Sequence, residues 1–144
     1  MHFAYPVTIK RAREGGYVVS FPDFPEAFTQ GETITEALQE ATDCLDEAVA
    51  GRIRRGEAIP TPTSSSPRRG RQVMLSTLIA TKAALSLALR TTGMSKTALA
   101  RRLGCDEKEV RRLLDPRHPS RLQRLEAALH VVGRRLVVEF ENVA

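Results

Sequence analysis

The sequence predicts an α+β protein in two parts. A small N-terminal β-sheet plus one helix is joined by a linker to an all-α helix-turn-helix domain with a short C-terminal strand. Strand-like segments come first, helical patterns dominate the second half, and a stretch rich in Pro, Ser and Thr separates them. The expected limits are 1–60 for the first domain, 61–72 for the linker and 73–144 for the second domain.

The first part begins with segments of strand composition. "HFAYPVTIK" and "GYVVSF" are rich in Val, Ile, Phe and Tyr, and Gly15 and Gly16 between them predict a hairpin. A third strand is expected around "AFTQ", and an edge strand at residues 58–60. A helix is expected to begin after Thr33, where Glu36 completes a capping box. Its apolar residues recur at helical spacing and form one stripe: Leu38, Ala41, Leu45, Ala48, Val49 and Ile53.

The second part is mainly helical. "PTPTSSSPRRGRQ" contains almost nothing apolar, which is typical of a linker, and "QVMLS" after it predicts a short strand. Ser76 can cap the helix that follows. Four helices are expected at about 77–92, 96–103, 107–114 and 121–132, and a terminal strand at 136–140.

The charge differs between the two halves. Residues 1–60 contain six Lys and Arg against ten Asp and Glu, a net charge of −4. Residues 61–144 contain sixteen against seven, a net charge of +9, which together gives the +5 of the chain. A basic face attracts the phosphate backbone of nucleic acid, so the halves are expected to bind different partners.

Several classes of protein do not fit. No window approaches the ~18 apolar residues of a membrane span, and the N-terminus lacks the apolar region of a signal peptide, so a cytoplasmic protein without membrane contact is expected. Cys44 and Cys105 lack CxxC spacing and are expected to be buried thiols. The three histidines are scattered: His2, His118 and His130. We therefore predict no metal, no cofactor and no enzyme.

The segment "KTALARRLGCDEKEVRRLLD" predicts a helix-turn-helix. Gly104 lies where the tight turn needs a positive φ, and Ala100 is small where the helices cross. Ser95 and Asp106 can cap the two helices. The positions expected to be buried are Leu99, Leu103, Cys105, Val110 and Leu113. An ordinary helical hairpin shares this apolar pattern, but the turn glycine and the positive charge favour DNA binding.

In such a motif the second helix enters the major groove, and the first helix opens near a phosphate. Arg111 and Lys108 can donate hydrogen bonds to guanine, and Glu107 can accept one from cytosine. Arg112 is expected either at the groove or along the core. The predicted DNA-binding residues are Ser95, Lys96, Thr97, Glu107, Lys108, Arg111, Arg112 and Arg117. Because one motif reads a half-site, a homodimer on double-stranded DNA is expected.

The chain also resembles a known family. "YPVTIKRAREGGYVVSFPDFPEAFTQGETITEALQEATDCLDEA" is similar to the N-terminal domain of HicB antitoxins, and "KAAL", "ALARRLG" and "LQRLEAALHVVGRRL" are similar to the helix-turn-helix version of that family. The resemblance implies a partial RNase H-like fold in the first domain. It also implies a type II antitoxin that covers the catalytic histidine of a small mRNA-cleaving HicA-type toxin and represses its own operon.

The passage "FPDFPEAFTQGET" is the expected toxin-binding surface. Phe21 and Phe28 are expected to anchor it to the core, while Asp23 and Glu26 face outward as an acidic rim for a basic toxin. Gly31 is expected to allow a turn. The candidate toxin contacts are Phe21, Asp23, Phe24 and Glu26.

Two other functions stay open at this point. One is a ligand-sensing regulator whose first domain binds a small molecule, and the other is a nuclease. The oligomer can be a homodimer or a homotetramer.

Overall fold

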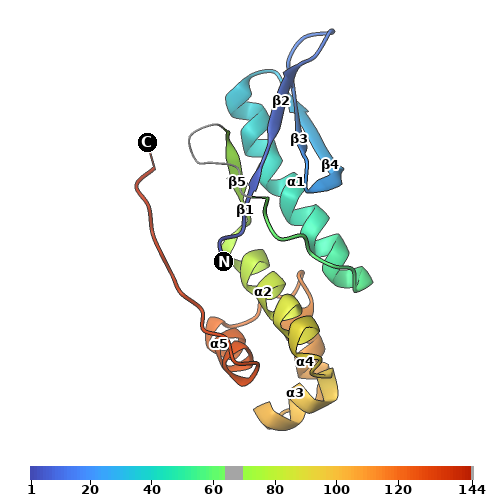
Figure 1. Cartoon of the computed structure of the whole chain (residues 1–144), viewed down its shortest axis with the longest axis vertical. Helices are drawn as coiled ribbons and strands as arrows, with labels where there is room; N and C mark the ends of the chain where they lie inside the picture. Colours follow the sequence, from blue (N-terminus) through green and yellow to red (C-terminus); the bar gives the residue numbers. More distant parts are fainter. Residues whose placement is uncertain (64–69, 144) are drawn as a thin grey trace. The chain divides into compact units, whose positions relative to one another are not determined.

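The computed structural model describes residues 1–63 and 70–143. The chain divides into two compact units, Met1–Ala80 and Thr81–Ala144, and each is considered by itself. Figure 1 shows strands and one long helix in the first unit and only helices in the second. The predicted α+β class is confirmed.

The first unit is a sheet covered on one face by a helix (Figure 1). Strands β2 (Thr8–Arg11), β3 (Tyr17–Phe21) and β4 (Phe24–Gly31) form an antiparallel sheet in the order β2-β3-β4. Strand β1 (Ala4–Pro6) pairs antiparallel with β5 (Gln72–Met74). The predicted hairpin, third strand and "QVMLS" strand are confirmed. The predicted edge strand at residues 58–60 is wrong, because this segment pairs with no strand. Its carbonyls accept side chains instead: Ala58 accepts Arg52 Nη1 at 3.0 Å, and Pro60 accepts the Tyr5 hydroxyl at 2.8 Å.

Helix α1 (Ile34–Arg55) begins where the sequence predicts. The Thr33 hydroxyl accepts the Glu36 backbone N–H at 3.1 Å, and the Glu36 carboxylate accepts the N–H of Glu32 at 3.0 Å. Its inward face lies on the sheet and buries the residues Ala37, Ala41, Leu45, Val49, Ala50 and Gly51. The predicted apolar stripe is therefore the core side of the helix, with Leu38, Ala48 and Ile53 half-buried at its margins.

Gly31 is required by close packing rather than by a turn. Its φ is not positive, but a Cβ built on it would lie 2.5 Å from the backbone nitrogen of Ala37 and 2.8 Å from its Cα. The end of β4 thus approaches the start of α1 as closely as two backbones allow. The expectation that Gly31 serves a turn is corrected accordingly.

We expect Gly31→Ala to lower the free energy of unfolding of the first unit by about 1–3 kcal/mol, since backbone atoms must move to admit the methyl group. Urea unfolding followed by tyrosine fluorescence measures this unit alone, because both tyrosines, Tyr5 and Tyr17, lie in it and the chain has no Trp. Gln30→Ala, at the exposed neighbouring position, is the control. Equal midpoints for the two variants would contradict the packing argument.

The second unit contains the rest of α2 (Thr77–Thr92) from Thr81 onward, and α3 (Lys96–Leu103), α4 (Glu107–Leu114) and α5 (Leu122–Val131). All four helices were predicted from the sequence, with α3 and α4 at the predicted bounds. The largest fully buried apolar side chains of its core are Leu85, Leu99, Val110, Leu125 and Leu129.

The predicted terminal strand at residues 136–140 is wrong for the single chain. Residues 134–143 run as an extended trace after α5 (Figure 1) and pair with no strand among the described residues. A strand forms only when its backbone groups find a neighbouring strand. The apolar side chains of this segment are strongly exposed: Val137 78%, Val138 75%, Phe140 94% and Val143 96%.

Candidate functional site

The loop between β3 and β4 is built around Phe24. Its ring is fully buried and meets the Tyr5 ring edge-on, with centroids 4.9 Å apart at 73°. The guanidinium of Arg52 lies 5.0 Å from the centre of the same ring. Burial, with the Asp23 carboxylate nearby, raises the pKa of Tyr5 to about 12, so its hydroxyl stays a donor to Pro60. The loop is therefore a fixed part of the core.

Both carboxylates of the loop have partners within the chain. Glu26 accepts hydrogen bonds from Arg52 Nε at 2.6 Å and Nη2 at 3.1 Å, and Arg52 Nη1 also donates to the Ala58 carbonyl at 3.0 Å. Asp23 accepts the Thr63 backbone N–H at 3.0 Å and the Thr63 hydroxyl. The expectation that both carboxylates face outward did not include these partners within the chain.

The hydrogen bonds from Arg52 lower the pKa of Glu26 below its usual value. A carboxyl with a lowered pKa in the folded state stabilises the fold above its unfolded pKa and loses this effect as pH falls through the folded pKa. We expect Glu26→Gln to be less stable than the native chain at pH 7 and the difference to shrink toward pH 3. Tyrosine fluorescence during urea unfolding measures it, with Glu40→Gln on the exposed face of α1 as control. A difference that is constant with pH would contradict the ion pair.

Phe24 and Phe28 are buried and exposed in the opposite way to what the sequence predicts. Phe28 was expected in the core but is 68% exposed, whereas Phe24, a predicted toxin contact, is fully buried. Phe21, another predicted contact, is also buried, at 2%. Ser20 pairs with Phe28 and Phe21 with Phe24, so residues 25–27 form an irregularity that reverses the alternation along β4. Of the four candidate toxin contacts, only the side chains of Asp23 and Glu26 reach the surface.

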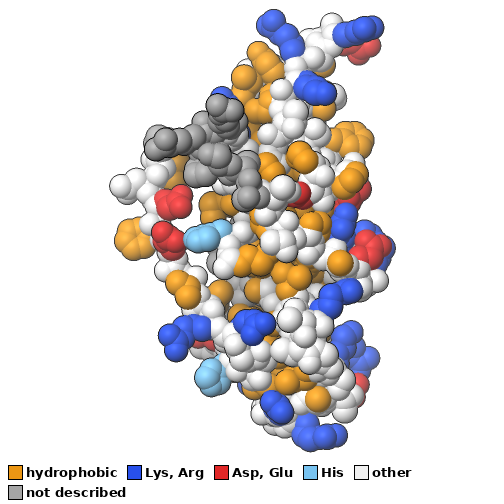
Figure 2. All heavy atoms as spheres, in the orientation of Figure 1, with side chains coloured by type: hydrophobic (Ala, Val, Ile, Leu, Met, Phe, Trp, Pro, Cys, Tyr) orange, Lys and Arg blue, Asp and Glu red, His pale blue; other side chains and the backbone are white. Residues whose placement is uncertain are grey.

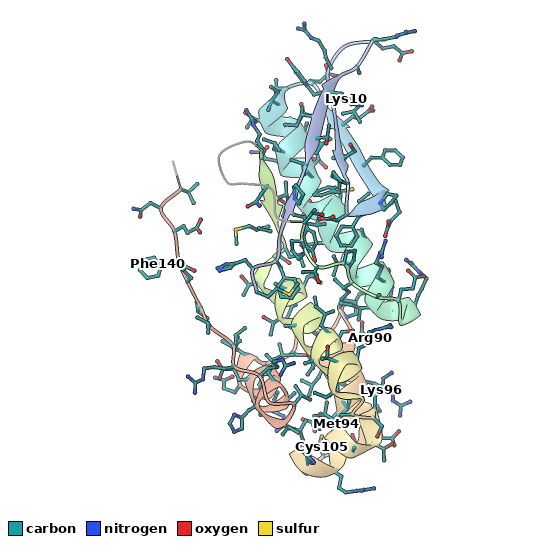
Figure 3. The ribbon with its side chains drawn as sticks, in the orientation of Figure 1. Lys10, Arg90, Met94, Lys96, Cys105 and Phe140 are labelled. Carbon is teal, nitrogen blue, oxygen red and sulfur yellow. The ribbon has the colours of Figure 1, made fainter. Side chains whose placement is uncertain are left out.

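The predicted helix-turn-helix is present as α3 and α4. The Ser95 hydroxyl accepts the Ala98 N–H at 3.0 Å, and Asp106 accepts the Glu109 N–H at 2.8 Å. Gly104 ends α3 in the left-handed conformation, with φ +67°. The buried positions between the helices are Leu99, Ala100, Val110 and Leu113, with Leu103 and Cys105 half-buried. Figure 3 places Lys96 at the start of α3 and Cys105 at the turn.

The predicted DNA-binding side chains lie on the surface of this unit. Lys108, Arg111 and Arg112 are exposed on α4, so Arg112 does not lie along the core. Ser95, Lys96, Thr97, Glu107 and Arg117 are also exposed. On the face shown in Figure 2, Lys and Arg predominate over Asp and Glu around the helices of the second unit. These positions fit a surface that faces a polyanion.

Two of the predicted DNA-binding residues, Thr97 and Glu107, also bind each other within the motif. The Thr97 hydroxyl donates to the Glu107 carboxylate, which ties the first turns of α3 and α4 together. Arg124 on α5 also holds the first turn of α4, with its Nε donating to Glu109 at 2.7 Å. Sequence reasoning missed this ion pair, because its residues are fifteen positions apart and belong to different helices.

Lys82 on α2 is the main residue that sequence reasoning missed. It is fully buried, and its Nζ lies within hydrogen-bonding distance of the Arg112, Asp115 and His118 carbonyls and of the Ser120 hydroxyl. Burial lowers its pKa to about 8, against the opposing effect of the Asp115 charge. The sequence contained a clue, since Lys82 is the one charged residue in the apolar run "LIATKAALSLAL".

Within residues 1–63 and 70–143, no group of three or more His, Cys, Asp and Glu is arranged to hold a metal ion. None of the helices in these ranges is long and apolar enough to cross a membrane. Both cysteines are free thiols, half-buried rather than fully buried as expected.

Comparison with known proteins places the chain in a family. The family described as HicB-like antitoxins of bacterial toxin–antitoxin systems matches residues 4–84. Antitoxin HicB 1 of Photorhabdus laumondii is 36% identical over 137 residues, covering 95% of this chain and 86% of the relative. Antitoxin HicB of Escherichia coli K12 is 38% identical over 133 residues, covering 92% and 95%, and that of Pseudomonas fluorescens is 34% identical over 127 residues, covering 88% and 87%. The family match covers more than half of the chain and the three relatives cover most of it, and the chain therefore belongs to the HicB family of antitoxins in toxin–antitoxin systems.

Proposed function

We propose that this antitoxin neutralises a small HicA-type mRNA-cleaving toxin through its first unit and represses its own operon through the second. The observation that supports repression most strongly is the helix-turn-helix itself. Its two caps, its turn glycine and its buried residues are in place, and α4 presents Lys108 and Arg111 to solvent. We place α4 in the major groove of the operator and the start of α3 near a phosphate.

For the toxin we propose a surface on the first unit that includes Asp23, Glu26 and the exposed ring of Phe28. Arg52 neutralises part of the charge of Glu26, so the acidity of this unit resides mainly elsewhere. Exposed acidic residues follow one side of α1, at Glu36, Glu40, Asp43 and Glu47. Complementary charge steers a basic RNA-cleaving partner toward such a face. In this role the antitoxin is not an enzyme, works in the cytoplasm and needs no cofactor.

The experiment is to co-express the chain with the product of the short gene beside its own. Affinity purification of the chain shows whether the second protein binds it, and growth of the cells shows whether the toxin is neutralised. We expect a stable complex and rescue from the toxin. No rescue, with both proteins expressed, would contradict neutralisation. For repression, a reporter behind the upstream DNA of the gene should be silenced by the intact chain.

A ligand-sensing regulator is the alternative that the same assays test. The described part of the first unit has a hollow of about 370 Å³ lined by β4 and α1. Four charged residues line it, namely Glu26, Glu47, Arg54 and Arg55, beside the small residues Ala27, Cys44, Ala48 and Gly51. This hollow is open to solvent, whereas ligand sites bury most of the surface of their ligand, so it does not favour the alternative.

A further inference from the structure

We propose that Lys82 is a positioning residue for the recognition helix. Its buried ammonium fixes the C-terminal end of α4 and the loop of residues 115–120, so operator affinity depends on a side chain that is fully buried. This inference rests on the proposed operator binding by α4. It concerns how the surface of α4 is held, not which residues touch bases.

The first part of the argument is the set of acceptors around Nζ. The Arg112 carbonyl lies at 3.0 Å, the His118 carbonyl at 2.7 Å and the Ser120 hydroxyl at 3.0 Å, with the Asp115 carbonyl also in contact. An ammonium has three N–H donors, and a buried one is stable only when they are all used. Four converging acceptors from one helix end and one loop therefore form a socket for a charged amine.

The second part is the length of α4. Eight residues make barely two turns, too few to be stable without tertiary contacts. Its first turn is held by the Asp106 cap, by the Thr97–Glu107 hydrogen bond and by the contact of Arg124 with Glu109. Asp115 follows its last turn without the left-handed cap that ends α1 and α3. Lys82 binds the Arg112 carbonyl in the last turn and so holds this end of α4 in place. Its positive charge is also favourable at the negative end of the helix dipole.

The third part is the loop after α4. Lys82 binds three of its residues, Asp115, His118 and Ser120, and the Ser120 hydroxyl also donates to the Arg112 carbonyl at 3.2 Å. This loop presents Arg117, one of the predicted phosphate contacts, to solvent. Lys82 therefore sets the position of base-facing Arg111 and Arg112 relative to a phosphate-facing residue.

The protonation of Lys82 gives this role a distinctive measurement. With a pKa of about 8, Lys82 is an ammonium at pH 7 and mostly a neutral amine at pH 9. A neutral amine directs a lone pair at carbonyl oxygens and leaves at least one of them unsatisfied. The charged and titratable residues around it are Arg112 on α4, and Asp115 and His118 in the loop.

The test is the affinity of the full chain for the DNA upstream of its own gene, at pH 7 and pH 9 and constant salt. At pH 7 we expect Lys82→Met to bind about 5- to 150-fold more weakly, the range set by misplacing a single base contact. Lys10→Met removes the same charge from exposed β2 (Figure 3) and should bind as the native chain does. Helix content by circular dichroism must be the same for all three.

Between pH 7 and pH 9 the native chain and Lys10→Met should lose about tenfold in affinity, following the protonated fraction of a group that titrates near pH 8. Lys82→Met should show no such change. A merely structural lysine would weaken binding without removing the pH dependence. If Lys82→Met does not fold, Ser120→Ala, which removes one acceptor, should bind less tightly than the native chain and keep the pH profile.

The outcomes separate the two proposals. If the native chain does not bind the upstream DNA, operator binding fails, and this inference fails with it. If the native chain binds and a folded Lys82→Met binds equally well, only the positioning role is overturned. The positioning role is also overturned if the affinity of the native chain for the upstream DNA does not change between pH 7 and pH 9 and Ser120→Ala binds that DNA as tightly as the native chain does.

Discussion

Replacing Arg111 by Ala should weaken operator binding by about 1–3 kcal/mol, a loss of roughly 5- to 150-fold, and leave binding to random DNA nearly unchanged. Arg111 is exposed on α4, one turn beyond Lys108. Its guanidinium can make two hydrogen bonds to one guanine, which no other base accepts equally. Fluorescence anisotropy with operator and scrambled duplexes at the same salt concentration measures both losses.

The matched control for Arg111→Ala is Arg54→Ala, which removes the same charge from an exposed position of the first unit. It should affect neither duplex. A loss of the same size on operator and scrambled DNA, with a lower salt dependence, would make Arg111 a phosphate contact instead. The variant should still rescue growth from the toxin, because neutralisation is assigned to the other unit.

We expect the chain to be a homodimer, and we expect removal of residues 136–144 to convert it into a monomer and to reduce operator affinity by more than the loss of any single contact. The segment exposes Val137, Val138, Phe140 and Val143, and Figure 3 shows Phe140 extending away from the chain. Burying each such side chain against a second copy is worth about 1.5–3 kcal/mol. Two copies of the segment can pair as antiparallel strands, which also explains why a strand-like sequence is unpaired in one chain. Light scattering gives the mass directly.

The control for the truncation is a full-length chain with Val138→Ser and Phe140→Ser, which keeps the backbone but loses the apolar contacts. It should dissociate more readily than the native chain. If the truncated chain keeps the mass of a full dimer, the segment is not the dimer contact and another surface must hold the copies together. The truncated chain should still bind toxin in the co-purification.

The helix-turn-helix could be predicted nearly to the residue because its determinants are local. Ser95 and Asp106 cap the helices that begin next to them, and Gly104 adopts the left-handed conformation that its position requires. The same holds for Thr33 at the start of α1. In each case the residue and its partner lie within four positions of each other, so the helix ends can be predicted from the spacing of these residues in the sequence.

The candidate toxin surface could not be predicted in the same way because its contacts are long-range. Glu26 meets Arg52 across 26 positions and Asp23 meets Thr63 across 40. The irregular pairing between β3 and β4 decides whether Phe24 or Phe28 is buried, and periodicity alone contains no information about it. Lys82 is the extreme case, since its acceptors are mainly backbone carbonyls, which every residue possesses.

Most side chains of α4 serve one of two tasks, and Glu107 alone is assigned to both, as a partner of Thr97 and as a predicted DNA contact. Val110 and Leu113 are buried and Glu109 is tied to α5, while Lys108, Arg111 and Arg112 have no such duty within the fold. Outward positions of this kind can mutate without lowering stability. If α4 binds the operator as proposed, operator preference can therefore diverge between related modules of one bacterium through changes at these three side chains, with the scaffold inherited unchanged.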